Sequence, residues 1–159
     1  MNAEVQTYSG YIRKRIGSIL STIEDLSDAQ LNWRPPIEGG NSPFVIATHV
    51  LVNARAWVIG IACGQALRRD RPAEFASSGS YEEIGKAACK LSGEIDEALE
   101  TLPADALERR LLPSQELWGE GEPHEISVRE ALLHVLEHAS IHLGQIQLTR
   151  DLAIRESGS

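Results

Sequence analysis

The chain has 159 residues, 42% of them hydrophobic and 24% charged, with a formal net charge of −8. This length and composition predict one soluble globular domain, residues 1–159, with a substantial core. An acidic surface repels phosphate backbones and anionic lipids, so we expect no nucleic-acid and no membrane partner. We see no apolar run of membrane-spanning length and no secretory leader, which predicts a cytoplasmic protein. Cys63 and Cys89 form no CxxC pattern and are expected to be buried and reduced.

The first half of the chain contains two amphipathic segments. Apolar residues recur at helical spacing over 3–26, which predicts the first helix. A second helix is predicted to begin at Pro43, with Asn41 or Ser42 as its N-cap, and to stop near Gly64.

The second half contains two further helix starts. The capping box Ser80-x-x-Glu83 opens a third helix, which Pro103 ends. A second capping box, Ser127-x-x-Glu130, opens a fourth helix that reaches to about 151 or beyond.

The segments between these helices are less regular. The arginine-rich stretch 68–71 is expected to be a solvated turn. Prolines and glycines exclude a long helix over 103–126, where 111–112 and 115–118 are expected to be short extended pieces that could form a small hairpin. Four amphipathic helices with one long irregular connection predict an all-α fold, an antiparallel four-helix bundle.

Histidines mark one face of the fourth helix. His134, His138 and His142 follow one another at intervals of four, so they share a face. Burying several imidazoles requires partners, and a divalent metal ion is the obvious candidate. Residues four apart rise about 6 Å and residues eight apart about 12 Å, whereas metal–nitrogen bonds are about 2 Å long. His134 and His142 therefore cannot easily share one ion, but either can pair with His138.

Spacing alone does not choose between these two pairs. On a helical wheel, His142 lies beside the apolar arc and His134 lies on the far side of His138, which favours the pair His138 and His142. Gln145 is close to His138 on the wheel and could bond to a metal-bound water or a substrate. A third ligand must come from another helix. His49 in the second helix would usually be a hydrogen-bonded core residue, but beside a matching pair it is a ligand candidate.

Several other residues are weaker candidates. Asn53 and Trp57 lie one and two turns after His49, where they could contact a substrate or cofactor, although Trp57 has core packing as its commoner role. Glu130 and Glu137 could orient imidazoles, with Glu137 expected to face solvent. His124 lies in a loop rich in glycine and proline and is expected to be a solvated surface residue.

The fourth helix is also apolar on a second side. Leu133, Ile141 and Leu148 lie near Gly144, away from His138. A bundle helix in a monomer rarely shows two apolar sides, so the pattern predicts a homodimer.

Together these motifs resemble the DinB/YfiT-like superfamily. The resemblance lies in His49 after a proline-started helix, in the Trp-Arg-Pro-Pro connection before it, and in His138-x-x-x-His142-x-Gly144-Gln145, and it covers nearly the whole chain. It implies an up-down-down-up bundle, commonly dimeric, with a histidine triad for a divalent ion, often zinc or nickel. By resemblance the metal ligands are His49, His138 and His142, and His134 is a neighbour. The superfamily includes transferases that use bacillithiol and an isomerase that uses mycothiol.

An open coordination position would make such a site suitable for catalysis. We therefore expect a metal-dependent enzyme, either a thiol S-transferase or a hydrolase, with a small-molecule substrate; a low-molecular-weight thiol is a candidate second cofactor. No catalytic acid or base stands beside the histidine pair, unlike in HExxH. That feature supports an alternative, a non-catalytic metal- or ligand-binding stress-response protein. A third alternative is a bundle with a satisfied polar core and no ion.

Overall fold

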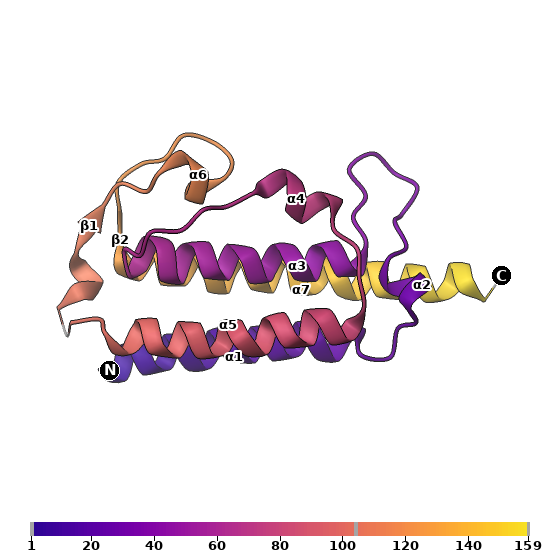
Figure 1. The fold of residues 1–159 in the computed structure, drawn as a ribbon, viewed down its shortest axis with the longest axis horizontal. Coiled ribbons are helices and arrows are strands. Elements are labelled where there is room, and N and C mark those ends of the chain that lie inside the picture. Colours follow the sequence, from indigo (N-terminus) through magenta and orange to yellow (C-terminus); the bar gives the residue numbers. More distant parts are fainter. Residues whose placement is uncertain (1, 104, 159) are drawn as a thin grey trace.

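The computed structural model describes residues 2–103 and 105–158. Four long helical segments dominate it (Figure 1). They are α1 (Ala3–Ile23), α3 (Pro43–Ala54) with its π-helical continuation η1 (Arg55–Ala62), α5 (Tyr81–Glu100) and α7 (Val128–Ser157). The predicted all-α fold is confirmed.

The long helices pack as two overlapping pairs. Figure 1 shows α1 and α7 running in one direction and α3 and α5 in the opposite direction. Helix α7 contacts α1 and α3–η1, while α5 contacts α1, α3 and η1. Almost completely buried aliphatic side chains from all four segments fill the core, among them Ile12, Ile19, Ile23, Val45, Val50, Val58, Ile95, Leu99, Leu132 and Ile146.

The α3–η1 helix is the most apolar of the four. Residues 43–62 are long enough to cross a membrane, and an 18-residue stretch within them has a mean hydropathy of 1.6, contrary to our expectation that no run reaches that length. In the structure 83% of this apolar stretch is buried inside the bundle. This helix therefore serves as the core helix around which the others pack.

The helix starts follow the predicted caps. The Ser42 side chain accepts a hydrogen bond from Val45 N, which makes Ser42 rather than Asn41 the cap of α3. Both predicted capping boxes are present at the starts of α5 and α7. Helix α1 ends at Ile23, before the predicted end at 26, and a short helix that the sequence analysis missed follows it, α2 (Asp28–Leu31).

The connections are more structured than predicted. Residues Arg71–Ala76 form a helix, α4, which begins at the last residue of the expected turn 68–71. After η2 (Ala106–Glu108), strand β1 (Arg110–Leu111) pairs antiparallel with β2 (Ile126–Ser127). A small hairpin-like sheet therefore exists, but residues Gln115–Trp118 form one helical turn, α6, instead of an extended piece.

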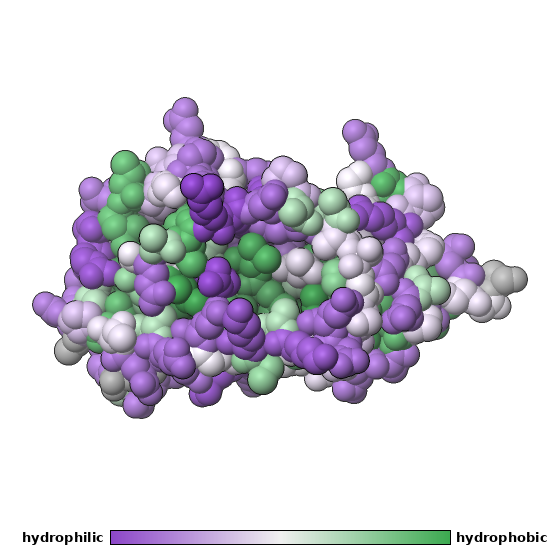
Figure 2. All heavy atoms as spheres, in the orientation of Figure 1, coloured by the Kyte–Doolittle hydropathy of each residue, from purple (hydrophilic) through white to green (hydrophobic). Residues whose placement is uncertain are grey.

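The visible outer surface is mostly hydrophilic. Hydrophilic side chains cover most of the face in Figure 2, and apolar side chains gather near its middle, over α3–η1.

Cys63 is half-buried, whereas Cys89 is exposed, so the expectation that both are buried was wrong for Cys89. Burial raises the pKa of the Cys63 thiol to about 11, despite the opposing effect of Arg109, so this thiol is a poor nucleophile.

Candidate metal centre

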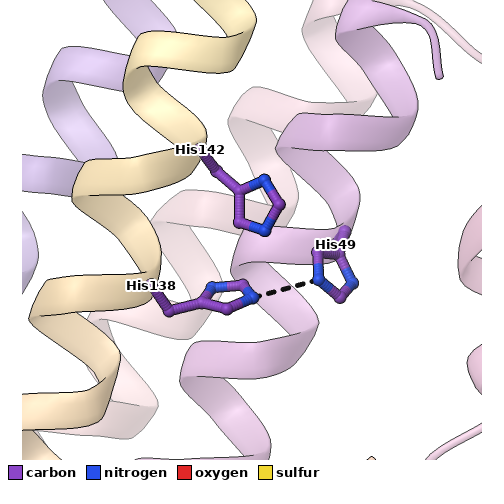
Figure 3. Close-up of side chains that lie close together, drawn as sticks. All are labelled: His49, His138 and His142. Carbon is purple, nitrogen blue, oxygen red and sulfur yellow. Dashed lines mark hydrogen bonds between the residues drawn. The ribbon is translucent and has the colours of Figure 1, made fainter. Parts of the chain in front are cut away.

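Three histidines converge between α3 and α7. His49 projects from α3, and His138 and His142 project from successive turns of α7 into the same space (Figure 3). One ligand atom of each lies within 4.8 Å of those of the other two. His49 Nε2 is 3.0 Å from His138 Nε2. The structure thus brings together the three residues that the sequence analysis named as metal ligands.

A buried carboxylate holds the ring of His49. Glu74 on α4 is 3% exposed, and its Oε2 lies 2.8 Å from His49 Nδ1. Arg69 donates to both carboxylate oxygens of Glu74, at 2.7 and 3.1 Å. Burial raises the pKa of Glu74, but the hydrogen bonds from His49 and Arg69 outweigh it and hold the pKa below its ordinary value. An ionised Glu74 accepts the Nδ1 proton, so Nε2 of His49 presents its lone pair to the triad.

Sequence reasoning missed this support. The stretch 68–71 was expected to be a solvated turn, but Arg69 is buried because its guanidinium bonds to Glu74 inside the protein. The two carboxylates proposed to orient imidazoles do not do so. Glu130 bonds to Ser127 in a capping box and pairs with Arg110, and Glu137 is exposed, as expected.

Gln145 supports a second ligand. Its Oε1 lies 2.7 Å from His142 Nδ1. An amide oxygen only accepts, so His142 carries its proton on Nδ1 and leaves Nε2 available. Gln145 therefore bonds to His142. From the sequence we expected it close to His138, one helical turn away, with a water or a substrate as its partner. Two of the three imidazoles are held in the tautomer that a metal requires.

Burial lowers the pKa of the two ligand candidates on α7. Burial, together with the neighbouring His142 and His49, lowers the pKa of His138 far below its ordinary value. Burial also lowers the pKa of His142, although the bond to Gln145 opposes this effect. Imidazoles bind metals only when deprotonated, so protons compete weakly for His138 and His142 near neutral pH.

Comparison with known proteins agrees with the fold and the motifs. The family model of the DinB superfamily matches residues 12–146. The chain belongs to the DinB superfamily. A crystal structure described as the conserved protein of locus from Enterococcus faecalis is similar to this DinB protein with a TM-score of 0.70, over 97% of this chain and 98% of that one. Their sequence identity is 14%, so the likeness shows the fold alone. No curated protein matches the chain.

A cavity of about 640 Å³ opens beside the triad of this DinB protein. Asn53 and Trp57 lie in its wall, as does Trp118 from α6. Trp57 stacks on His134 with ring centres 3.5 Å apart, and Trp118 lies between Trp57 and the exposed ring of His124. The stacking holds His134 against the aromatic wall, outside the three-histidine cluster, as expected for a neighbour of the site.

Unpartnered polar atoms gather around the same cavity. Among the described residues, five buried side-chain nitrogen or oxygen atoms lack a hydrogen-bond partner, and they belong to Thr48, Asn53, Trp57, His134 and His138. Four of these residues line the cavity. Buried polar atoms are normally paired, so this concentration indicates a place built to meet a ligand. Three imidazoles whose ring nitrogens face one another form a donor set that suits a borderline divalent ion such as zinc or nickel.

Proposed function

We propose that this protein is a metal-dependent enzyme that binds a divalent ion, zinc or nickel, through His49, His138 and His142. The observation that carries the proposal is the clustering of the three ring nitrogens, with Glu74 and Gln145 accepting the protons on the far sides of two rings. Such hydrogen-bond partners fix the orientation of the ligating ring and raise its affinity for the metal.

A bound ion with an open position would lower the pKa of a thiol or a water molecule and would polarise an electrophile. The chain's own residues prepare the surroundings. Glu74 and Gln145 keep the ligand tautomers, and Trp57 and Trp118 exclude water from one side of the cavity. Asn53, 4% exposed with an unpartnered Oδ1, offers a polar contact to a substrate or cofactor.

The choice of reaction follows from the carboxylates near the triad. Glu74 behind His49 is engaged by His49 and Arg69, so it is not free to act as a general base. Among the described residues, the two carboxylates that line the cavity are also paired, Glu120 with Arg71 and Glu130 with Ser127 and Arg110. A thiol that ionises needs no further base to become a nucleophile. This favours a thiol S-transferase that uses a low-molecular-weight thiol over a hydrolase. The same engagement of Glu74 supports a second candidate, a non-catalytic metal- or ligand-binding stress-response protein.

Turnover assays separate these candidates. Metal-loaded protein is incubated with bacillithiol, mycothiol and simpler thiols, each with a panel of electrophiles. The enzyme proposal expects turnover that a chelator removes and added metal restores, and that His142→Ala lacks. Glu137→Ala, an exposed change on the same helix, serves as the matched control. Metal retention without any turnover would favour the binding protein.

We also propose that the protein is a cytoplasmic homodimer. Leu133, Ile141 and Leu148 on α7 are 47%, 64% and 64% exposed, and a Cβ built on Gly144 meets nothing within 4 Å. Together they form an apolar stripe on the side away from the triad, which suits a second subunit. Ile141→Glu should shift the mass in analytical ultracentrifugation from dimer to monomer; a wild type that is monomeric at high concentration contradicts the proposal.

A further inference from the structure

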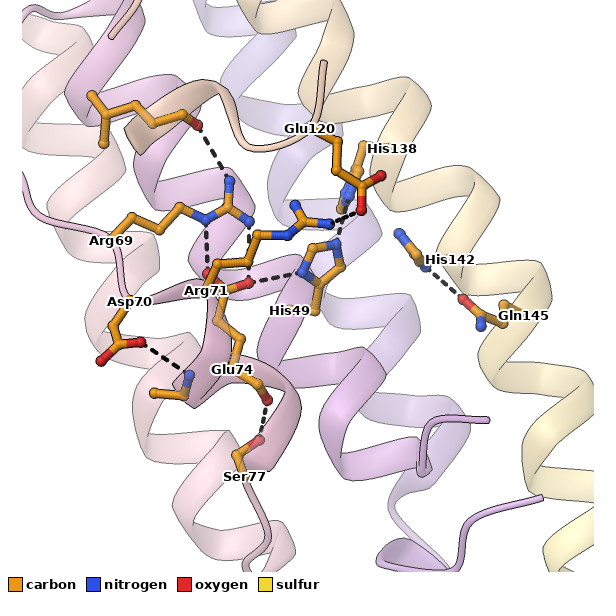
Figure 4. Close-up of polar contacts among 12 residues, drawn as sticks. His49, Arg69, Asp70, Arg71, Glu74, Ser77, Glu120, His138, His142 and Gln145 are labelled. Carbon is orange, nitrogen blue, oxygen red and sulfur yellow. Dashed lines mark hydrogen bonds and ion pairs between the residues drawn. The ribbon is translucent and has the colours of Figure 1, made fainter. Parts of the chain in front are cut away.

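A cationic side chain lies at the mouth of the cavity. Arg71, the first residue of α4, lines the cavity and donates from Nη2 to Glu120 Oε1 at 2.9 Å (Figure 4). Its guanidinium carbon is 5.3 Å from the centre of the Phe75 ring, and that ring is 5.1 Å from the ring of His49. Two ring contacts therefore connect this positive charge to the histidine triad.

Arg69 and Arg71 differ in how firmly their partners are fixed. The Arg69 side chain is 1% exposed and is held by the buried Glu74. The Arg71 side chain is 31% exposed, and its partner Glu120 is 86% exposed. Exposed ion pairs contribute little because water screens them and both side chains lose freedom. Arg71 can therefore exchange Glu120 for another anion at small cost, whereas Arg69 cannot leave Glu74.

The loop that carries Glu120 is shaped around the guanidinium. Gly119 adopts φ +98°, and a Cβ at this position would lie 2.8 Å from Arg71 Nη1. Gln115 Nε2 donates to the carbonyl oxygens of Gly119 and Gly121, which holds the loop in this form. Among the described residues, Glu120 is the one hydrogen-bond acceptor of Arg71. A guanidinium has several donors in a planar fork, so Arg71 retains donors for a ligand.

We propose that Arg71 anchors an anionic group, such as a carboxylate, of the substrate or thiol cosubstrate, which takes the place of Glu120 on the guanidinium. The inference rests on the proposed function, because the other end of the same molecule is held at the triad. Arg71 is the one lysine or arginine among the cavity-lining residues of the described chain, and it stands out in a protein of net charge −8. Within the described part of the chain, an anion at this opening would therefore meet Arg71 and no second lysine or arginine of the cavity wall.

The test compares matched thiols that differ only at the far end. Mercaptopropionate and mercaptohexanoate are paired with mercaptoalcohols of equal length, and the affinity of cobalt-loaded protein for each is measured by visible absorption and by calorimetry. The thiol proton passes to the buffer, so the pH is held constant. The variants are Arg71→Gln and Glu120→Gln, with Arg13→Gln as the control, because Arg13 loses an equal charge and a similar exposed pair with Asp96 far from the cavity.

The wild type should prefer a carboxylate thiol to its alcohol by about tenfold, the size expected of a charge-assisted hydrogen bond. Arg71→Gln should remove this preference while leaving alcohol affinity unchanged. Glu120→Gln should increase the preference, and Arg13→Gln should preserve it. Equal preference in Arg71→Gln and wild type, or equal loss in Arg13→Gln, overturns the anchor. A wild type that takes up no cobalt in elemental analysis before any thiol is added overturns the metal site itself, and the anchor with it.

Discussion

The α1–α5 and α3–α7 helix pairs differ in whether their buried polar groups have hydrogen-bond partners. Where α1 meets α5, Ser9 Oγ and Arg13 Nη1 both donate to the carboxylate of Asp96, at 2.8 and 2.9 Å. In the described part of the chain, every buried side-chain nitrogen or oxygen without a partner lies on α3, η1 or α7. One pair is a conventional amphipathic interface, and the other retains unsatisfied groups around a cavity. Native proteins depart from complete pairing mainly at functional sites.

Removing a central ligand should have the largest effect. His138 contacts both His49 and His142, so His138→Ala should weaken metal binding by more than about 100-fold, beyond the loss typical of a residue that only supports a ligand. Competition with a coloured chelator measures the affinity. The adjacent exposed variant Glu137→Ala should bind metal as the wild type does. Equal affinities in His138→Ala and wild type would remove this residue from the site.

A change in the other helix pair should alter stability and leave the site alone. Ile95 on α5 is fully buried, so Ile95→Ala should lower the free energy of unfolding by about 2–5 kcal/mol. Urea denaturation measures this change, with the exposed neighbour Cys89→Ala as the control. Metal stoichiometry should be unchanged while the variant is folded. A parallel loss of metal in folded Ile95→Ala would show that the two pairs are not separable.

A smaller effect is expected from the carboxylate behind His49. Glu74→Gln should weaken metal binding by about 10–100-fold, because the ring of His49 loses its charged acceptor. Isothermal titration calorimetry measures the affinity. Arg69 also loses its buried counter-ion, so Arg69→Gln, which leaves the bond between Glu74 and His49, separates orientation from stability. If Arg69→Gln weakens metal binding as much as Glu74→Gln does, Glu74 does not act by orienting His49.

The same contrast explains what the sequence could reveal. Local signals were reliable: Ser42, the two capping boxes and the helical spacing of the histidines predicted the helices and the ligand face. Helical rise showed that His134 and His142 cannot easily share one ion, and the helical wheel then favoured His138 and His142, the pair that the structure brings to His49.

The support for His49 was not visible in the same way. His49 and Glu74 are 25 residues apart, and they meet because α4 folds back over α3. A signal for α4 was available, because Asp70 is its N-cap and Pro72 lies in its first turn. The arginines around them resembled a solvated turn instead. Single helical turns such as α6 have too few residues for periodicity to show.

The pH dependence of the metal-free protein should be the mildest test. Burial, with a further contribution from Arg69, lowers the pKa of His134 from 6.5 to about 4. The unfolded chain therefore binds a proton at higher pH than the folded one, so stability is full above pH 6.5 and is lost as the pH falls towards about 4. Urea midpoints across this window measure the loss, and His134→Gln should make the profile less steep. His138 and His142, whose pKa values burial also lowers, contribute the remaining pH dependence. An unchanged profile in that variant would show that His134 does not contribute to the pH dependence of stability.

The most direct test of the metal centre is the metal content of purified protein after reconstitution with zinc or nickel and desalting. Elemental analysis should find one ion per chain in the wild type and almost none in His49→Ala, with circular dichroism showing both proteins folded. A folded wild type that retains no ion, or a His49→Ala variant that retains as much as the wild type, would contradict a metal centre formed by α3 and α7.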